Sequence, residues 1–165
     1  MASSLVSVPD ADGWVPVERP QPHVEDVQED GHGIWVIFAK EMEGEKFLVR
    51  FPDEPEYRYL DSGIQIEASE AEGDLRLRVE KRVGGEIEAL YEEKLKEIES
   101  LPESFLLKAK LSADGQMFDL FYRSNEKWVW ERVQTTSKLL YTFHTESPDM
   151  SGEAHRKFIR SLDVY

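Results

Sequence analysis

A chain of 165 residues is long enough for one domain that buries roughly two thirds of its unfolded surface. It has no cysteine, which excludes disulfides, thiol catalysis and cysteine-ligated zinc, and no run near the roughly 18 apolar residues that span a membrane. Its formal net charge of −14 disfavours binding to the phosphate backbone of nucleic acids or to anionic lipid.

Residues 1–31 form an acidic, proline-rich leader that we expect to be poorly ordered, and residues 32–165 are expected to form a single α+β domain. The first residues lack the basic and apolar regions of a signal peptide. The chain as given is therefore expected in the cytoplasm, or outside it if a signal was removed. His23 and His32 lie among acids in the leader, but their spacing matches no recognised metal site, so we expect no metal and no cofactor.

The first part of the domain is predicted to consist of antiparallel strands. Apolar residues there form a continuous run or alternate strictly, with turn residues between the runs. Met42–Glu45 is expected to connect the first two strands as a hairpin, and Pro52 ends the second because proline cannot donate to a ladder. The predicted strands are Gly33–Lys40, Lys46–Phe51, a short piece at Tyr57 and Tyr59, Ile64–Ala71 and Leu75–Lys81.

The period then changes, and Glu86–Ser100 is predicted to be an amphipathic helix that Pro102 ends. Each large apolar side chain that it buries would contribute about 1.5–3 kcal/mol, far more than its ion pairs, so this helix must cover a sheet. Its acidic outer face is a candidate surface for a protein partner, although such faces are more often simply solvated. The acids on it are Glu88, Glu92, Glu93 and Glu97.

Four β-rich runs separated by short polar breaks predict an antiparallel meander over Phe105–Phe143. Alternation places its first apolar residues, Phe105, Leu107, Ala109 and Leu111, on one face. A second helix is expected after Pro148, capped by Ser151 and with an apolar stripe of Ala154, Phe158, Ile159 and Leu162. The predicted fold class is α+β, with one antiparallel sheet covered by two helices.

Four features of the domain carry a resemblance to a known family. They are the strand Phe47-Leu48-Val49-Arg50-Phe51-Pro52, the long helix, the meander, and Ser147-Pro148 followed by Phe158-Ile159-Arg160-Ser161-Leu162. Over roughly residues 33–165 the chain resembles the PsbP/Mog-like family, which includes the Ran-binding Mog proteins, photosystem PsbP proteins and bacterial DcrB-type proteins. The resemblance implies a PsbP/Mog-like sandwich and a role in binding or assembly, with some bacterial members similar to chaperones. It brings no catalytic motif.

The segment Trp128–Val133 is the most informative local feature. Trp128, Trp130 and Arg132 share one face of its strand, whereas Val129 and Val133 share the other with a glutamate. If the valines point inward, two tryptophans and an arginine are exposed together, a composition typical of protein-binding hot spots. In the alternative, the tryptophans lie under a helix and Arg132 reaches outward to solvent.

The distribution of charge bears on the kind of partner. Residues 1–100 contain 25 Asp and Glu against 11 Lys and Arg, whereas residues 101–165 contain nine of each. The acid serves either solubility or the steering of a partner protein with a basic surface.

No phosphate-binding, nucleophile-elbow or dinucleotide motif occurs in the sequence. The first hypothesis is therefore a non-catalytic protein-binding module, an adaptor or a chaperone-like assembly factor. The alternatives are a small-ligand carrier or carboxylate-based enzyme with a pocket between the sheet and the long helix, and a structural domain of a larger assembly.

Overall fold

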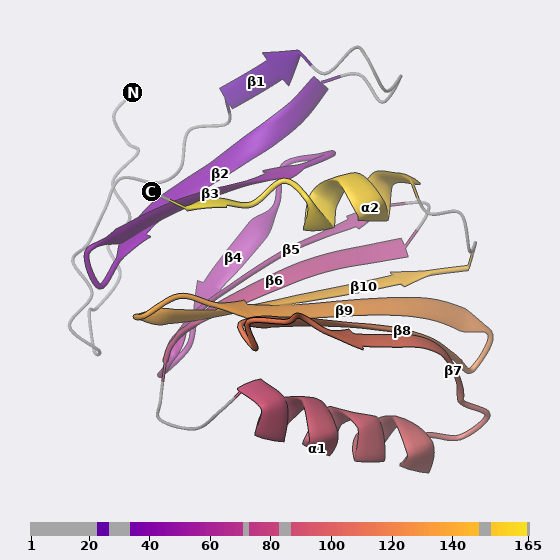
Figure 1. The fold of residues 1–165 in the computed structure, drawn as a ribbon. Coiled ribbons are helices and arrows are strands. Elements are labelled where there is room, and N and C mark those ends of the chain that lie inside the picture. Colours follow the sequence, from indigo (N-terminus) through magenta and orange to yellow (C-terminus); the bar gives the residue numbers. More distant parts are fainter. Residues whose placement is uncertain (1–22, 27–33, 71–72, 83–86, 149–152, 165) are drawn as a thin grey trace.

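The computed structural model describes residues 23–26, 34–70, 73–82, 87–148 and 153–164, which form two antiparallel sheets and two helices (Figure 1). The small sheet has the spatial order β1-β2-β3-β11, and the large sheet has the order β4-β5-β6-β10-β9-β8-β7. The small-sheet strands are β1 (His23–Asp26), β2 (Ile34–Met42), β3 (Glu45–Phe51) and β11 (Asp163–Val164). The large-sheet strands are β4 (Glu56–Tyr59), β5 (Gly63–Glu70), β6 (Gly73–Lys81), β7 (Phe105–Leu111), β8 (Met117–Ser124), β9 (Lys127–Thr135) and β10 (Leu139–Ser147).

Tight turns set the register of two hairpins. Glu43 and Gly44 both have positive φ, 51° and 80°, which is the signature of the two-residue turn that matches strand twist and confirms the predicted hairpin between β2 and β3. Asn125 and Glu126 also have positive φ, 52° and 66°, and form the same kind of two-residue turn between β8 and β9. These turns place each strand's apolar residues opposite those of its neighbour.

The α+β class with antiparallel strands and two covering helices is confirmed, but the strands make two layers rather than one. Helix α2 (Glu153–Ile159) lies between the sheets, and α1 (Ile87–Ser100) lies on the far side of the large sheet (Figure 1). The expectation of a single sheet was wrong because Pro52 and Pro55 interrupt hydrogen bonding after β3. The chain can therefore leave the small sheet there and start the large one at β4.

The first core cluster fills the space between the two sheets. Phe158 of α2 is fully buried, with its ring centroid 4.8 Å from that of Phe51 on β3 and 5.3 Å from that of Phe143 on β10. Glu45 of the small sheet accepts hydrogen bonds from Tyr141 of the large sheet and from the hydroxyl of Thr136. An apolar wedge and a buried polar tie therefore hold the sheets together.

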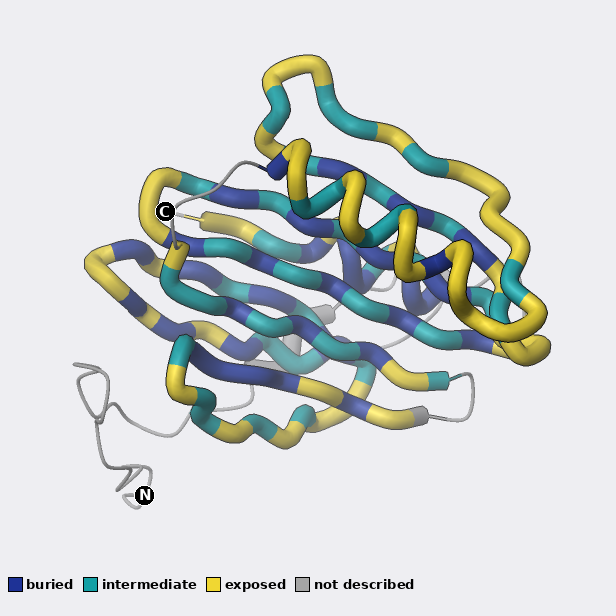
Figure 2. The backbone as a smooth tube through the Cα atoms, turned by 90° about the horizontal axis from the view of Figure 1, so that it is seen from below, coloured by how far each residue is buried: buried dark blue, intermediate teal, exposed yellow. Residues whose placement is uncertain are grey.

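The second core cluster lies on the opposite face of the large sheet, beneath α1. Ile87 and Ile98 of the helix are buried against apolar residues of β8 and β9, which confirms the predicted amphipathic stripe. Figure 2 shows the exposed outer turns of this helix. The predicted acids Glu88, Glu92, Glu93 and Glu97 are all exposed on it.

The face predicted for the start of the meander was wrong. A β-bulge between Leu106 and Lys108 shifts the register of β7 on β8, so Phe105 and Leu107 do not follow the alternation of Ala109 and Leu111. Ala109 and Leu111 pack in the second cluster, whereas Phe105 is 64% exposed. An edge strand tolerates such a bulge because it is paired on one side alone.

Several sequence predictions fall partly or wholly outside the described residues. Most of the leader is among these, as are His32 and Ser151. Within the leader, β1 is described and pairs antiparallel with β2. Neither described helix is both long and apolar enough to cross a membrane.

We expect Gly73→Ala to destabilise the fold much more than Gly115→Ala. Both glycines have positive φ, 130° and 71°, but an added Cβ at Gly73 would lie 1.8 Å from the carbonyl oxygen of Glu146, whereas at Gly115 it would meet nothing within 4 Å. The backbone cost alone is about 1–2 kcal/mol at Gly115, and the clash raises the loss at Gly73 to about 3 kcal/mol or more. Equilibrium urea unfolding measures both, and equal losses would contradict the close approach.

Candidate functional site

The two orientations left open for the Trp128–Val133 segment are now distinguished. Val129 and Val133 are 5% and 0% exposed and pack beneath α1. Trp128, Trp130 and Arg132 are half-buried on the opposite face of the large sheet, which α1 does not cover. The valines therefore point inward, and the two tryptophans and the arginine share the opposite face, where Trp130 also packs against the first core cluster.

Strand β8 extends this surface with a third aromatic ring. Phe121 lies directly opposite Trp130 in the β8–β9 register. Its ring stacks on Trp128, with centroids 5.8 Å apart and planes 23° from parallel. The guanidinium carbon of Arg123 lies 5.2 Å from the Trp128 ring centroid, within cation–π range. The rings thus form a continuous aromatic floor.

Asp119 holds two members of this surface in place. Its carboxylate accepts hydrogen bonds from Trp130 Nε1 at 3.0 Å and from Arg132 Nε and Nη2 at 2.8 and 3.2 Å. The side chains of Arg132 and Asp119 are 18% and 16% exposed, so this two-pronged pair is largely shielded from water. Trp130 and Arg132 therefore hold defined orientations before anything binds.

A cavity of about 540 Å³ lies between this face of the sheet and α2. Strand β7 contributes Lys108 and Lys110 to its lining. Helix α2 contributes the buried His155 and the exposed Arg156, and Arg160 follows directly after the helix. Among the described residues that line it, Asp119 is the one carboxylate. We call this cavity the aromatic–cation pocket, and define it by Phe121, Trp128, Trp130, Lys108, Lys110, Arg132, Arg156 and Arg160.

The two surfaces predicted from the sequence lie on opposite faces of the large sheet. Figure 1 shows α1 on one side of the large sheet and α2 on the other. The predicted acids are exposed on α1, whereas residues of α2 line the aromatic–cation pocket. They therefore cannot form one site. The contributions of Phe121 and Asp119 were missed, although the Ser124–Lys127 turn sets the register that puts them beside Trp130 and Arg132. Nothing local in the sequence indicates that Arg156 and Arg160 approach the same cavity.

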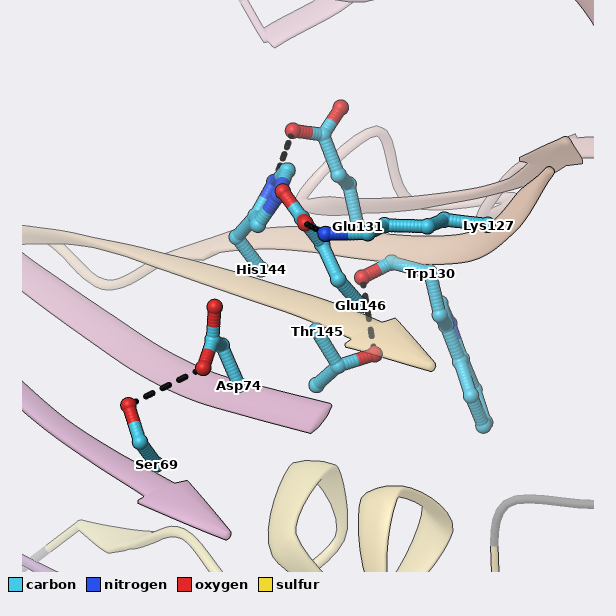
Figure 3. Close-up of polar contacts among 8 residues, drawn as sticks. All are labelled: Ser69, Asp74, Lys127, Trp130, Glu131, His144, Thr145 and Glu146. Atoms are coloured by element: carbon cyan, nitrogen blue, oxygen red, sulfur yellow. Dashed lines mark hydrogen bonds and ion pairs between the residues drawn. The ribbon is translucent and has the colours of Figure 1, made fainter. Parts of the chain in front are cut away.

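A second polar cluster, on the other face of β9 and β10, surrounds His144. Figure 3 shows Glu131 and His144 on one side of these strands and the Trp130 ring on the other. His144 Nδ1 lies 2.6 Å from Glu131 Oε2, and Nε2 lies 3.0 Å from Glu146 Oε2. Both ring nitrogens are thus engaged, so this imidazole is held as a donor to two carboxylates.

The pKa values of the cluster follow from this arrangement. Burial by itself would lower the pKa of His144, but the hydrogen bonds to Glu131 and Glu146 outweigh it and raise the pKa above 6.5. Burial would likewise raise the pKa of Glu131, but its hydrogen bond with His144 brings it below 4.5. The hydrogen bond from His144 is the main cause of the fall in the pKa of Glu146, to about 2. The cluster is therefore a charged clamp between strands.

Fold and site together define a class: an α+β sandwich with the PsbP-like fold and an accessible aromatic and cationic pocket. No protein-family model and no curated protein sequence matches the chain.

The fold itself matches 15 chains of solved structures. One of them is the solution structure of cyanobacterial PsbP (CyanoP) from Synechocystis sp. PCC 6803. It is similar to this protein with a TM-score of 0.57 and 16% sequence identity, over 79% of this chain and 92% of that one. At this identity the likeness establishes the fold.

The clamp predicts a stability difference between the wild type and His144→Gln that depends on pH. Because the pKa of His144 is raised, its contribution is complete below pH 6.5 and is lost as the pH rises through the folded-state pKa. Because the pKa of Glu146 is lowered, its contribution is present above pH 4.5 and is lost as the pH falls towards 2. The difference in free energy of unfolding should therefore be largest between those limits, at about 1.5–3 kcal/mol. Urea unfolding across the pH range measures it, and a difference independent of pH would contradict the clamp.

A double-mutant cycle of Asp119→Ala and Arg132→Met tests the preorganisation of the pocket. The pair is largely shielded, so we expect a coupling free energy of about 1–3 kcal/mol. The matched control is the more exposed pair Glu43 and Lys81, whose atoms are 3.8 Å apart and whose coupling should be about 0.5 kcal/mol or less. Equal coupling in both cycles would show that Asp119 does not fix Arg132.

Proposed function

We propose that the protein is a non-catalytic protein-binding module of the adaptor or assembly-factor kind, and that its recognition surface is the aromatic–cation pocket. One observation carries the proposal: Trp128, Trp130 and Arg132 lie together, half-buried, on a part of the large sheet that the small sheet and α2 cover only partly. Tryptophan and arginine are the residue types most enriched among the energetic hot spots of protein interfaces.

The rigidity of the surface supports the same proposal. Rings that are already stacked and an arginine already held by Asp119 lose little conformational freedom on binding. A preformed surface therefore retains more of its contact energy as affinity. The PsbP-like fold is consistent with this role, since the family that the sequence resembles is associated with binding and assembly. We also propose that the protein is related to the Mog-like or DcrB-like members of that family.

The absence of catalysis is also proposed. His144, the histidine with two short carboxylate contacts, has both ring nitrogens engaged and so lacks a ring nitrogen available as a base. Among the described residues, no group of three or more His, Asp or Glu side chains is placed to hold a metal ion.

A small-ligand carrier is the second candidate, because the cavity of about 540 Å³ has the size of many small-molecule sites. This cavity lies against α2, whereas the sequence placed the pocket beside the long helix, where the side chains of the second core cluster now pack. Its lining is cationic, which does not suit a mechanism based on paired carboxylates.

Capture of a stoichiometric partner from the native cells tests the proposal. We expect Trp128→Ala/Trp130→Ala to reduce recovery of the partner at least tenfold, because the loss of two interface tryptophans costs about 2 kcal/mol or more each. The control Glu92→Gln/Glu93→Gln on α1 should leave recovery unchanged. Because the tryptophans are half-buried, Arg156→Ala/Arg160→Ala serves as a second variant at exposed positions that preserves the core.

If only the α1 variant loses the partner, the interface is the acidic face of α1 and the partner has a basic surface. No stoichiometric partner for the wild type would contradict the binding-module proposal.

A further inference from the structure

We propose that the aromatic–cation pocket receives an extended acidic segment of the protein partner, which adds as a strand to the free edge of β7 and directs carboxylates towards Lys108 and Lys110. This inference rests on the proposed function and specifies the chemistry of the partner. The charge of the cavity, the open strand edge and the register of β7 each support it.

The charge of the pocket is opposite to that of the protein. The chain has a net charge of −14, yet the described residues that line this cavity include five lysines and arginines and one carboxylate. That carboxylate, Asp119, is already bound to Arg132 and Trp130. The remaining four cations make no ion pair with any carboxylate in the described part of the chain. An incoming anion would relieve their mutual repulsion.

The acidic remainder of the protein does not prevent this. At physiological ionic strength the Debye length is about 8 Å, so charges farther away are largely screened and the nearest ones dominate. The large sheet lies between α1 and α2 (Figure 1), and the second core cluster fills the space between α1 and that sheet, so the acids of α1 are on the opposite side from the pocket. An anion within the cavity therefore experiences mainly the lysines and arginines around it.

The edge of β7 determines the shape of the partner. In the described structure β7 is the last strand of the large sheet, paired on one side with β8. Its first residues are apolar and accessible, with Phe105, Leu106 and Leu107 64%, 40% and 37% exposed. An open edge with accessible apolar residues is the surface that an extended peptide uses when it adds a strand to a sheet.

The register of β7 fixes the spacing of the acids. Lys108 and Lys110 pair with Phe121 and Asp119, so both lysines lie on the face of the pocket. A strand added beside β7 would place every second side chain on that same face. The segment therefore needs acidic residues two positions apart, opposite the two lysines.

A simpler reading assigns these lysines to protection of an edge strand against aggregation. It accounts for Lys108 and Lys110 but not for Arg156 and Arg160, which reach the same cavity from the other side. Nor does it account for the accessible Phe105 on the same edge. An acidic segment accounts for the four cations together, because all four line the cavity that receives its carboxylates.

The test uses the full chain and a fluorescent ten-residue peptide that alternates glutamate with valine or phenylalanine, together with versions in which glutamine or lysine replaces glutamate. Fluorescence anisotropy should show binding of the glutamate peptide, at least tenfold weaker binding of the glutamine peptide, and none of the lysine peptide. Lys108→Glu/Lys110→Glu should weaken binding at least tenfold, which corresponds to about 1.4 kcal/mol. The control Lys46→Glu/Lys96→Glu makes the same change in net charge at exposed positions outside the pocket and should change the affinity less than threefold. Amide hydrogen exchange along β7 should slow in the complex.

Equal binding of the glutamate and glutamine peptides, or an equal loss with the control variant, would overturn the inference. Binding of naphthalene-2-sulfonate without binding of any peptide would also overturn it, and would identify a small-molecule pocket. If the native partner is lost with the tryptophan variant while no acidic peptide binds, the acidic segment is wrong and the binding module stands. If the peptide binds and no native partner is recovered, the proposed function fails independently.

Discussion

The burial of Phe158 between Phe51 and Phe143 is the contact on which the candidate site depends. Helix α2 has seven residues, too few for a stable helix by itself in water, so its existence depends on the packing of its apolar side chains. With Phe158 between the two sheets, α2 is held beside the exposed part of the large sheet. The positions of His155 and Arg156 follow directly from that placement, and Arg160 follows at the end of the helix.

A large sheet with two faces also explains why a recognition surface exists here. The small sheet and α2 cover one face over β5, β6 and β10, whereas α1 covers the other face over β8 and β9. Neither cover extends across all seven strands. The face of β7–β9 next to α2 is therefore only partly enclosed, and its exposed apolar area is taken up by stacked aromatic rings that Asp119 and the flanking cations hold. The opposite face of β10 is occupied by the His144 clamp.

This arrangement separates charges of opposite sign. The acids of α1 face solvent on one side of the molecule, and the lysines and arginines of the pocket gather on the other. Net charge describes the average surface, which sets solubility and long-range steering, but recognition depends on the few charges within a Debye length of the contact. A protein with a strongly acidic composition can therefore offer a cationic site, provided that the fold brings distant basic residues together.

The sequence by itself determined the elements whose neighbours are close along the chain. Alternation and helical spacing predicted β8, β9, β10 and α1, and the segment Trp128–Val133 indicated two faces of different chemistry. The tertiary structure decided what depends on distant contacts. Which face of β9 is buried depends on where α1 packs, and the bulge in β7 arises from its edge position. How the two sheets pack on one another depends on α2 lying between them. Arg156 and Arg160 join Lys108 and Lys110 only through the packing of Phe158, since periodicity sets which side chains share a face but not which faces meet.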